Sequence, residues 1–225
     1  MTSGTNFLIP VKNPDSAKQR LADVLTASER RELALALMDT VLDAALCART
    51  REDCGILIIT DSEEIDQRAA ARGVTVLREQ KAEGETAAIE SATRWSLDHG
   101  FGRQIVIPGD MPWIDAQDVR ALIDFRSGPR SVVLCPATGD DGTNAIVTCP
   151  PDVLTYRFGQ NSFPDYVDQC RRRGIECHIL RLPRLALDLD TPEDLKIFMD
   201  RPADNPVYRL VSVWNLQKRR SAVRG

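Results

Sequence analysis

The sequence predicts a single α/β domain in which a mostly parallel central sheet is flanked by helices. A length of 225 residues with 43% hydrophobic content is enough for one substantial core. Apolar strand-like runs alternate with segments of helical periodicity, the order that produces a parallel sheet with helices on both faces. The continuous apolar run at residues 56–60 is typical of a central parallel strand.

The predicted elements follow one another in a regular order along the chain. Strands are expected at residues 7–11, 56–60, 74–77, 104–107, 132–134, 144–148 and 175–180. Helices are expected at residues 62–71, 86–97, 115–125, 164–173 and 192–200, with a long one from Ser28 through Leu42. Ser28 and Thr191 are the expected N-caps of two of these helices, and Pro164 suits a first helical turn.

Composition and charge narrow the class of protein. The formal net charge is −4 and the isoelectric point is near 5.3, which argues against a nucleic-acid partner. No apolar run approaches the roughly 20 residues of a membrane span, and residues 1–6 do not resemble a signal peptide, so a cytoplasmic protein without a membrane contact is expected. The six cysteines form no CxxC motif and are expected to be reduced thiols.

The end of the chain differs in composition from the rest. We place the domain at residues 6–200 and a basic C-terminal tail at residues 201–225. The basic residues near its end are Lys218, Arg219, Arg220 and Arg224. The tail is expected to be solvated or partly disordered. The alternative is a subunit contact, which would use the apolar residues Val211, Val213 and Trp214.

Two acidic segments carry the strongest chemical signal. Residues 107–112 read IPGDMP and residues 187–192 read LDLDTP, and each is expected to follow a buried strand that a proline ends. Alternation in an extended chain would place Asp188 and Asp190 on one face. Together with Asp110 they predict a Mg²⁺ site, because hard cations take oxygen ligands. The alternatives are a turn aspartate at Asp110 and a helix-start partner at Asp190.

The loop after the first strand carries three cations, Lys12, Lys18 and Arg20. In doubly wound folds this loop commonly holds phosphate, and such cations can neutralise a triphosphate. Neither GxGxxG nor GxxxxGK[ST] is present, so Rossmann dinucleotide binding and P-loop chemistry have no support. A solvated basic loop is the alternative.

Two further loops offer neutral hydrogen-bond donors. Residues 140–145 read DDGTNA, in which Thr143 and Asn144 could hold a carboxylate or a phosphate. Residues 158–164 read FGQNSFP, where Gly159 and Ser162 precede or begin a helix whose amides could bind an anion. An ordinary Asp-Gly turn and a capped loop are the alternatives.

Taken together and in order, these segments resemble the CofC/FbiD family, the guanylyltransferases of coenzyme F420 biosynthesis. The matching segments, spread over roughly residues 6–199, are IPVK, AKQRLA, IPGDMP, DDGTNA, FGQNSF and LPRLALDLDTPEDL. The resemblance implies a GT-A-like (Rossmann-like) nucleotidyltransferase. Such enzymes join GMP from GTP to 2-phospho-L-lactate, phosphoenolpyruvate or 3-phospho-D-glycerate and release pyrophosphate. The sequence leaves open which acid is used.

By the same resemblance, each site residue receives a role. Thr143, Gly159 and Ser162 match the positions that hold the acid. Asp110, Asp188 and Asp190 match the metal positions, where Mg²⁺ is the expected cofactor. Lys12 and Lys18 match the basic nucleotide end, where they and Asp110 are the expected catalytic residues; Arg20 is added to the nucleotide end as the third cation of the loop. Hand-over to the downstream F420 transferase is expected, and a homodimer is the common default.

One segment departs from the family pattern, because EGET stands at residues 83–86 where family members commonly show a glycine followed by Leu-Asn-Ala. Glu85 could accept hydrogen bonds from guanine N1–H and the amino group, or it could simply favour the helix start. Two readings compete with the guanylyltransferase. One is another GT-A-type nucleotidyltransferase with a different acceptor, and the other is a non-catalytic nucleotide-binding protein.

Overall fold

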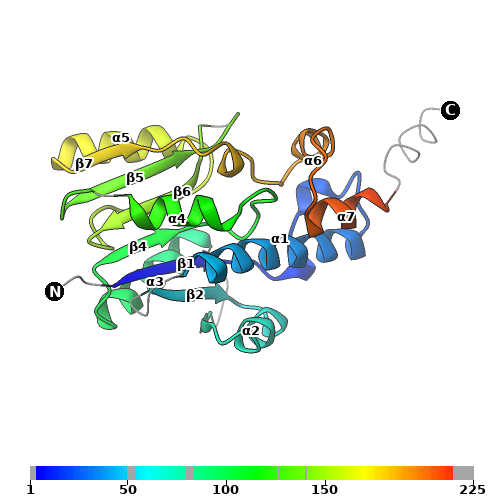
Figure 1. Ribbon diagram of the computed structural model, residues 1–225, viewed down its shortest axis with the longest axis horizontal. Coiled ribbons are helices and arrows are strands. Elements are labelled where there is room, and N and C mark those ends of the chain that lie inside the picture. The colour runs from blue at the N-terminus through cyan, green and yellow to red at the C-terminus, as the bar shows by residue number, and fades with distance from the viewer. Residues whose placement is uncertain (1–3, 50–53, 80–83, 126, 140, 215–225) are drawn as a thin grey trace.

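The computed structural model describes residues 4–49, 54–79, 84–125, 127–139 and 141–214, and they form one seven-stranded sheet covered by helices on both faces (Figure 1). The strands lie in the order β3-β2-β1-β4-β6-β5-β7. Their bounds are β1 Thr5–Pro10, β2 Cys54–Thr60, β3 Thr75–Arg78, β4 Arg103–Val106, β5 Ser131–Pro136, β6 Thr143–Cys149 and β7 Glu176–Ile179.

The sheet is parallel except at β6, which runs antiparallel to both β4 and β5. A short turn joins β5 to β6, and a connection of this length can join only antiparallel strands. The short turn therefore sets the direction of β6. The predicted mostly parallel α/β domain is confirmed. The parallel strands β1 to β4 therefore present their carboxyl ends at one common edge.

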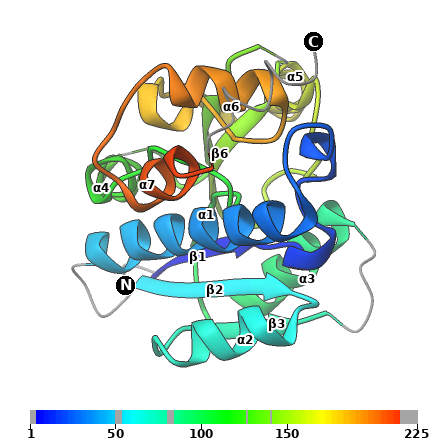
Figure 2. The ribbon, with the colours of Figure 1, turned by 90° about the vertical axis from the view of Figure 1, so that its right-hand side faces the viewer.

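The helices divide between the two faces according to the alternation of the strands (Figure 2). Helices α1 (Ala27–Ala48), α2 (Glu63–Ala70) and α4 (Ala116–Asp124) cover one face. Helices α3 (Glu85–Asp98) and α5 (Ser162–Arg173) cover the other. On β1, for example, Phe7 and Ile9 face the first group while Leu8 faces the second.

A third apolar cluster lies beyond the sheet, where α6 (Pro192–Met199) and α7 (Pro206–Ser212) pack beside the N-terminal half of α1 (Figure 1). The predicted domain boundary at residue 200 leaves out part of this cluster. Val207, Val211 and Trp214 are buried in it, whereas Val213 is 68% exposed. Apolar burial thus keeps residues 206–214 with the domain, and they are not a solvated tail. Residues 215–225 lie outside the described residues.

Several element boundaries differ from those predicted. The long helix α1 is capped by Thr26 and not by Ser28, because Thr26 and Glu29 form a reciprocal capping box. Helix α5 begins at Ser162, two residues before Pro164, with Asn161 as its N-cap. Residues 187–190 are extended but pair with no sheet strand among the described residues. Thr191 is confirmed as the N-cap of α6.

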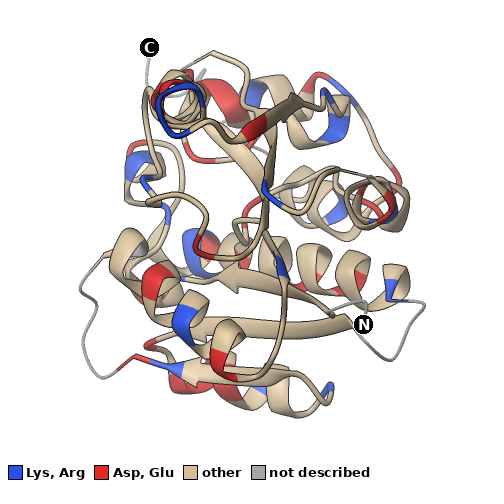
Figure 3. Ribbon diagram, turned by 90° about the vertical axis from the view of Figure 1, so that its left-hand side faces the viewer, with Lys and Arg blue, Asp and Glu red and all other residues tan. Residues whose placement is uncertain are grey.

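Two absences hold for the described part of the chain. None of its helices is long and apolar enough to cross a membrane. All six cysteines lie within it, and none of them forms a disulfide there. In the view of Figure 3, segments that carry Lys or Arg are interspersed with segments that carry Asp or Glu.

Candidate active site

A cavity of about 470 Å³ opens along the edge where the parallel strands end. Its lining includes Pro10 at the end of β1, Ile59 in β2, Glu79 just after β3 and Asp110 beyond β4. The loop from residue 11 to residue 20 contributes further lining residues. Neighbouring strands are about 4.8 Å apart, so these four strand ends span roughly 14 Å. This is the edge at which open α/β sheets bind ligands.

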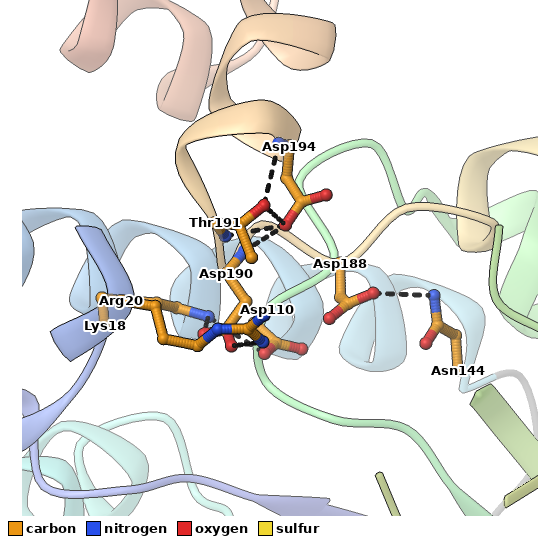
Figure 4. Close-up of polar contacts among 8 residues, drawn as sticks. All are labelled: Lys18, Arg20, Asp110, Asn144, Asp188, Asp190, Thr191 and Asp194. Atoms are coloured by element: carbon orange, nitrogen blue, oxygen red, sulfur yellow. Dashed lines mark hydrogen bonds and ion pairs between the residues drawn. The ribbon is translucent and has the colours of Figure 1, made fainter. Parts of the chain in front are cut away.

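Lys18 lies at the centre of the charged part of the cavity (Figure 4). Its side chain is only 7% exposed, and its Nζ lies 3.0 Å from Asp110 Oδ2 and 3.5 Å from Asp190 Oδ1. Burial by itself would lower the pKa of Lys18, but the charges of Asp110 and Asp190 outweigh it, so the pKa is raised and the ammonium is retained. Lys18 also has a left-handed backbone with φ of 54°, a conformation that costs a non-glycine residue about 1–3 kcal/mol.

The two acidic segments are joined directly. Leu189 N donates a hydrogen bond to the backbone O of Asp110 at 3.1 Å. This backbone contact brings the segment after β4 next to the segment before α6. The same segment lies close to the end of β1 at Gly109, where an added Cβ would lie 3.1 Å from Val11 Cγ2 and 3.4 Å from Pro10 O. The predicted meeting of the two segments is confirmed, although the second of them is not a strand.

Asp190 faces the cations of the first loop. Besides Lys18 it contacts Arg20, whose Nη1 lies 3.2 Å from Asp190 Oδ2. The helix start is instead served by Asp194, whose Oδ2 accepts from Asp190 N at 3.2 Å and from Thr191 N and Oγ1 at 2.7 Å each (Figure 4). Asp194, and not Asp190, therefore provides the side chain that accepts hydrogen bonds at the start of α6. The Thr191-x-x-Asp194 pattern of a capping box could have indicated this from the sequence.

Asp188 lies between the other two aspartates and β6. Leu187 and Leu189 are buried in the third cluster, so alternation turns Asp188 and Asp190 the other way, as predicted. Asn144 Nδ2 donates to Asp188 Oδ1 at 3.4 Å. Burial, and next the charge of Asp110, raise the pKa of Asp188 to about 6.

The three aspartates have the chemistry of a divalent-cation site but are not arranged as one here. Among the described residues, no group of three or more His, Cys, Asp or Glu side chains is placed to hold a metal. The ammonium of Lys18 instead bridges Asp110 and Asp190. Asp110 Oδ1 is nevertheless buried without a hydrogen-bond partner in the described chain, and an orphaned carboxylate oxygen suits a hard cation.

Thr143, Gly159 and Ser162, the predicted acid-binding residues, are not among the residues that line the cavity. Thr143 Oγ1 and Ser162 Oγ are both buried and have no hydrogen-bond partner among the described residues. Phe163 N donates to Asp141 O at 2.9 Å, which brings the start of α5 against the turn before β6. Gly159, with φ of 102°, allows the sharp bend of that loop. Buried donors without partners are expected where a ligand supplies the missing acceptor.

The remaining predicted residues line the cavity or border it. Lys12 is an exposed lining residue. Glu85 is the first residue of α3, directly after the lining residue Gly84, and its side chain lies outside the described residues. Sequence reasoning missed Asp61 and Glu79, which line the cavity after β2 and β3. Only their place at strand ends could have indicated them.

Comparisons with known proteins show which family the chain belongs to. A profile of the family described as "Guanylyl transferase CofC like" matches residues 5–208. A 3-phospho-D-glycerate guanylyltransferase from Colwellia psychrerythraea is 39% identical over 86% of this chain and 90% of its own. A phosphoenolpyruvate guanylyltransferase from Sphaerobacter thermophilus is 35% identical over 85% of this chain and 91% of its own.

Solved structures show the same fold. A putative nucleotide-diphospho-sugar transferase from Desulfovibrio desulfuricans superposes with a TM-score of 0.72 at 19% identity, covering 93% of this chain and 94% of the other. A Mycobacterium tuberculosis protein solved as a complex with manganese gives 0.56 at 17% identity over 89% of this chain and all of its own. With the family profile covering most of its length, the chain belongs to the CofC-like guanylyl transferase family.

Proposed function

We propose that the protein transfers GMP from GTP to a phosphorylated three-carbon acid, with release of pyrophosphate, as a step of coenzyme F420 biosynthesis. One observation carries the proposal. A buried ammonium, that of Lys18, is held between Asp110 and Asp190 inside the strand-end cavity, while two buried hydroxyls without partners in the described chain lie at the starts of β6 and α5. A charged subsite for a triphosphate and a neutral-donor subsite for a second anion are what such a transfer requires.

The order of strands suggests how GTP would lie in the cavity. Lys12, Lys18 and Arg20 all follow β1, beside β4, and would hold the phosphates. The lining residues after β2 and β3 lie farther along the same edge and leave room for the ribose and base. Glu85, at the start of α3, is proposed to accept hydrogen bonds from guanine N1–H and the amino group.

The acceptor would enter from the side of β6 and α5. Thr143 Oγ1 and Ser162 Oγ would donate to the acid, and the amides of the turn at Gly159 would add further donors. A phosphate oxygen of the acid would then attack the α-phosphorus of GTP. A new P–O bond forms, the bond between the α-phosphorus and its bridging oxygen breaks, and pyrophosphate leaves with that electron pair. Because the acceptor phosphate is already an anion at pH 7, little proton transfer is needed.

Asp110, Asp188 and Asp190 are proposed to hold a divalent cation, Mg²⁺ by preference. When bound, this ion supplies charge neutralisation for the triphosphate and the leaving pyrophosphate. Lys18 would be released from the carboxylates that it now bridges and would donate to a phosphate oxygen instead. The chain's own contribution is thus to position two anions and to offset their repulsion.

The test is pyrophosphate release with each of four nucleoside triphosphates, crossed with 2-phospho-L-lactate, phosphoenolpyruvate and 3-phospho-D-glycerate. A parallel assay coupled to the downstream F420 transferase would trap labile products. We expect turnover with GTP and at least one acid. The matched control is Lys196→Ala, a lysine on α6 that is absent from the cavity lining and should leave turnover unchanged. GTP binding without turnover on any acid would contradict the proposal and favour a non-catalytic nucleotide-binding protein.

A further inference from the structure

The turn between β5 and β6 joins two parts of the site that are distant in the sequence. Ala137 N donates to Gly142 O at 3.0 Å and closes the turn. On one side, Asp141 O accepts from Phe163 N in the first turn of α5, next to Ser162. On the other, Thr138 N donates to Ala186 O at 2.8 Å, just before the acidic segment. The turn is therefore held against both the neutral-donor loop and the segment that carries Asp188.

The side chain of Asn144 adds a further connection between β6 and the segment that carries Asp188. It is the second residue of β6, only 6% exposed, and its Nδ2 donates to two acceptors. One is Leu185 O at 2.9 Å and the other is Asp188 Oδ1 at 3.4 Å (Figure 4). A single amide thus fixes the backbone of the 185–188 segment and the carboxylate that this segment presents. The residue before it in the strand, Thr143, carries one of the two unpartnered hydroxyls.

The amide is suited to this task because of the charges around it. Asp110 repels Asp188, so an Asp188 carboxylate without a donor would turn away from Asp110. A buried neutral donor holds the carboxylate in place without neutralising it. A cation at this position, such as a lysine, would compete with a metal for the same oxygens, as Lys18 does for Asp110 and Asp190. Partners of this kind orient metal ligands in many proteins.

We infer that Asn144 is a positioning residue that holds Asp188 in the orientation for a divalent cation and ties the acid subsite to the cation subsite as one rigid unit. The inference rests on the proposed function, because it takes Asp188 as a cation ligand. It adds a role for a residue that touches neither substrate in the proposed arrangement. Loss of the Asn144 amide should therefore weaken cation binding, and the weaker cation binding should in turn lower turnover.

The experiment measures Mn²⁺ binding to the full chain by electron paramagnetic resonance, without nucleotide or acid. The variants are Asn144→Ser, which shortens the side chain, and Asn144→Leu, which keeps nearly its size and shape but removes the donor without adding a charge. The matched control is Thr138→Ala, on the same turn, because Thr138 is exposed and contributes only its backbone N–H. Asp188→Ala marks the loss of the ligand itself.

We expect the dissociation constant for Mn²⁺ to rise about 10- to 100-fold in both Asn144 variants and to stay unchanged in Thr138→Ala. Turnover by Asn144→Ser should recover at saturating Mn²⁺, with kcat near that of the unaltered protein. A merely structural role would instead lower the melting temperature in cation-free buffer and would not be rescued by the cation. Melting curves of each variant distinguish these cases.

Two results would overturn the inference, and they differ. If both Asn144 variants bind Mn²⁺ tightly and Asp188→Ala does not, the positioning role of Asn144 is excluded, while the cation assignment of Asp188 stands. Unchanged Mn²⁺ binding in Asp188→Ala as well would remove the cation assignment in the proposed function, and the inference would fall with it.

Discussion

Replacing Lys18 by methionine should destabilise the cation-free protein and make its stability depend on divalent cations. The side chain keeps most of its length but loses the ammonium that lies 3.0 Å from Asp110 and 3.5 Å from Asp190. Since both carboxylate oxygens lie that close to one nitrogen, they are at most about 6.5 Å apart. In the variant these two like charges have no cation between them.

The magnitude follows from that separation. Two unit charges about 6.5 Å apart repel by about 2.5 kcal/mol at an effective dielectric constant of about 20. The carboxylates are 27% and 33% exposed, so solvent screens part of this repulsion and about 1–2.5 kcal/mol is expected. For a chain of this size, that loss lowers Tm by about 2–10 °C.

The assay is a thermal melt of both proteins in chelator and in rising Mg²⁺ or Mn²⁺. The variant should regain most of its lost Tm as the cation takes the place of the ammonium, while turnover stays roughly 100- to 1,000-fold reduced because the phosphates have lost their lysine. Lys196→Met is the control, since Lys196 is 54% exposed and contacts only Glu193 through its side chain among the described ion pairs. A variant that melts like the unaltered protein in chelator and turns over normally would refute the reasoning.

Three further predictions concern single side chains of the site. Asp188 has a pKa raised to about 6, above its unfolded value of about 4, so its contribution to stability is present below pH 4 and lost as pH rises through 6. Because cation binding needs the carboxylate, kcat/KM should rise with pH through about 6, and a pH–rate profile of Asp188→Asn should lack that limb. Thr143→Val keeps the shape of the side chain but removes its buried hydroxyl, which has no partner in the described chain. In steady-state kinetics, KM for the acid should rise at least 10-fold while KM for GTP stays unchanged. Equal changes in both KM values would contradict the place of Thr143 in the acid subsite. Asp194→Ala removes an acceptor of three hydrogen bonds around Thr191, so urea unfolding should show a loss of about 1–2 kcal/mol, whereas Asp204→Ala, an exposed aspartate, should show none.

The sequence predicted the sheet, the strand-end location of the site and the convergence of the two acidic segments. These features depend on local patterns: continuous apolar runs, alternation and proline after the acidic residues. Alternation alone correctly separated Leu187 and Leu189 from Asp188 and Asp190. The position of Asp110 follows from the parallel order of β1 and β4, which brings both strand ends to one edge.

The parts that could not be predicted depend on competition between similar local signals or on distant contacts. Both Thr26 and Ser28 can cap a helix, and the reciprocal bond of Glu29 to Thr26 decides between them. Residues 187–190 have a strand-like pattern, yet they pair with no strand of the described sheet, and Leu189 N donates to Asp110 O instead. Helix α7 lies in a segment with a basic end, and only the apolar surface of α1 and α6 explains its burial.

The bridge formed by Lys18 is the clearest case of a contact that no pattern reveals. Lys18 is 92 positions from Asp110 in the sequence, and its left-handed backbone is a conformation that lysine rarely adopts. Only the folded chain shows that one ammonium neutralises carboxylates from both acidic segments. In the proposed metal site, a cation would therefore have to compete with Lys18 for the oxygens of Asp110 and Asp190.

The most direct test of the account follows the phosphate oxygens of the acid acceptor. The acid is prepared with ¹⁸O in its phosphate and incubated with GTP, a divalent cation and the protein, and the products are analysed by mass spectrometry. If the acid phosphate attacks the α-phosphorus, all of the label stays in the guanylylated acid, one labelled oxygen bridges the two phosphorus atoms, and the pyrophosphate is unlabelled. Label in the pyrophosphate, or GMP released without a guanylylated acid, would contradict the proposed transfer.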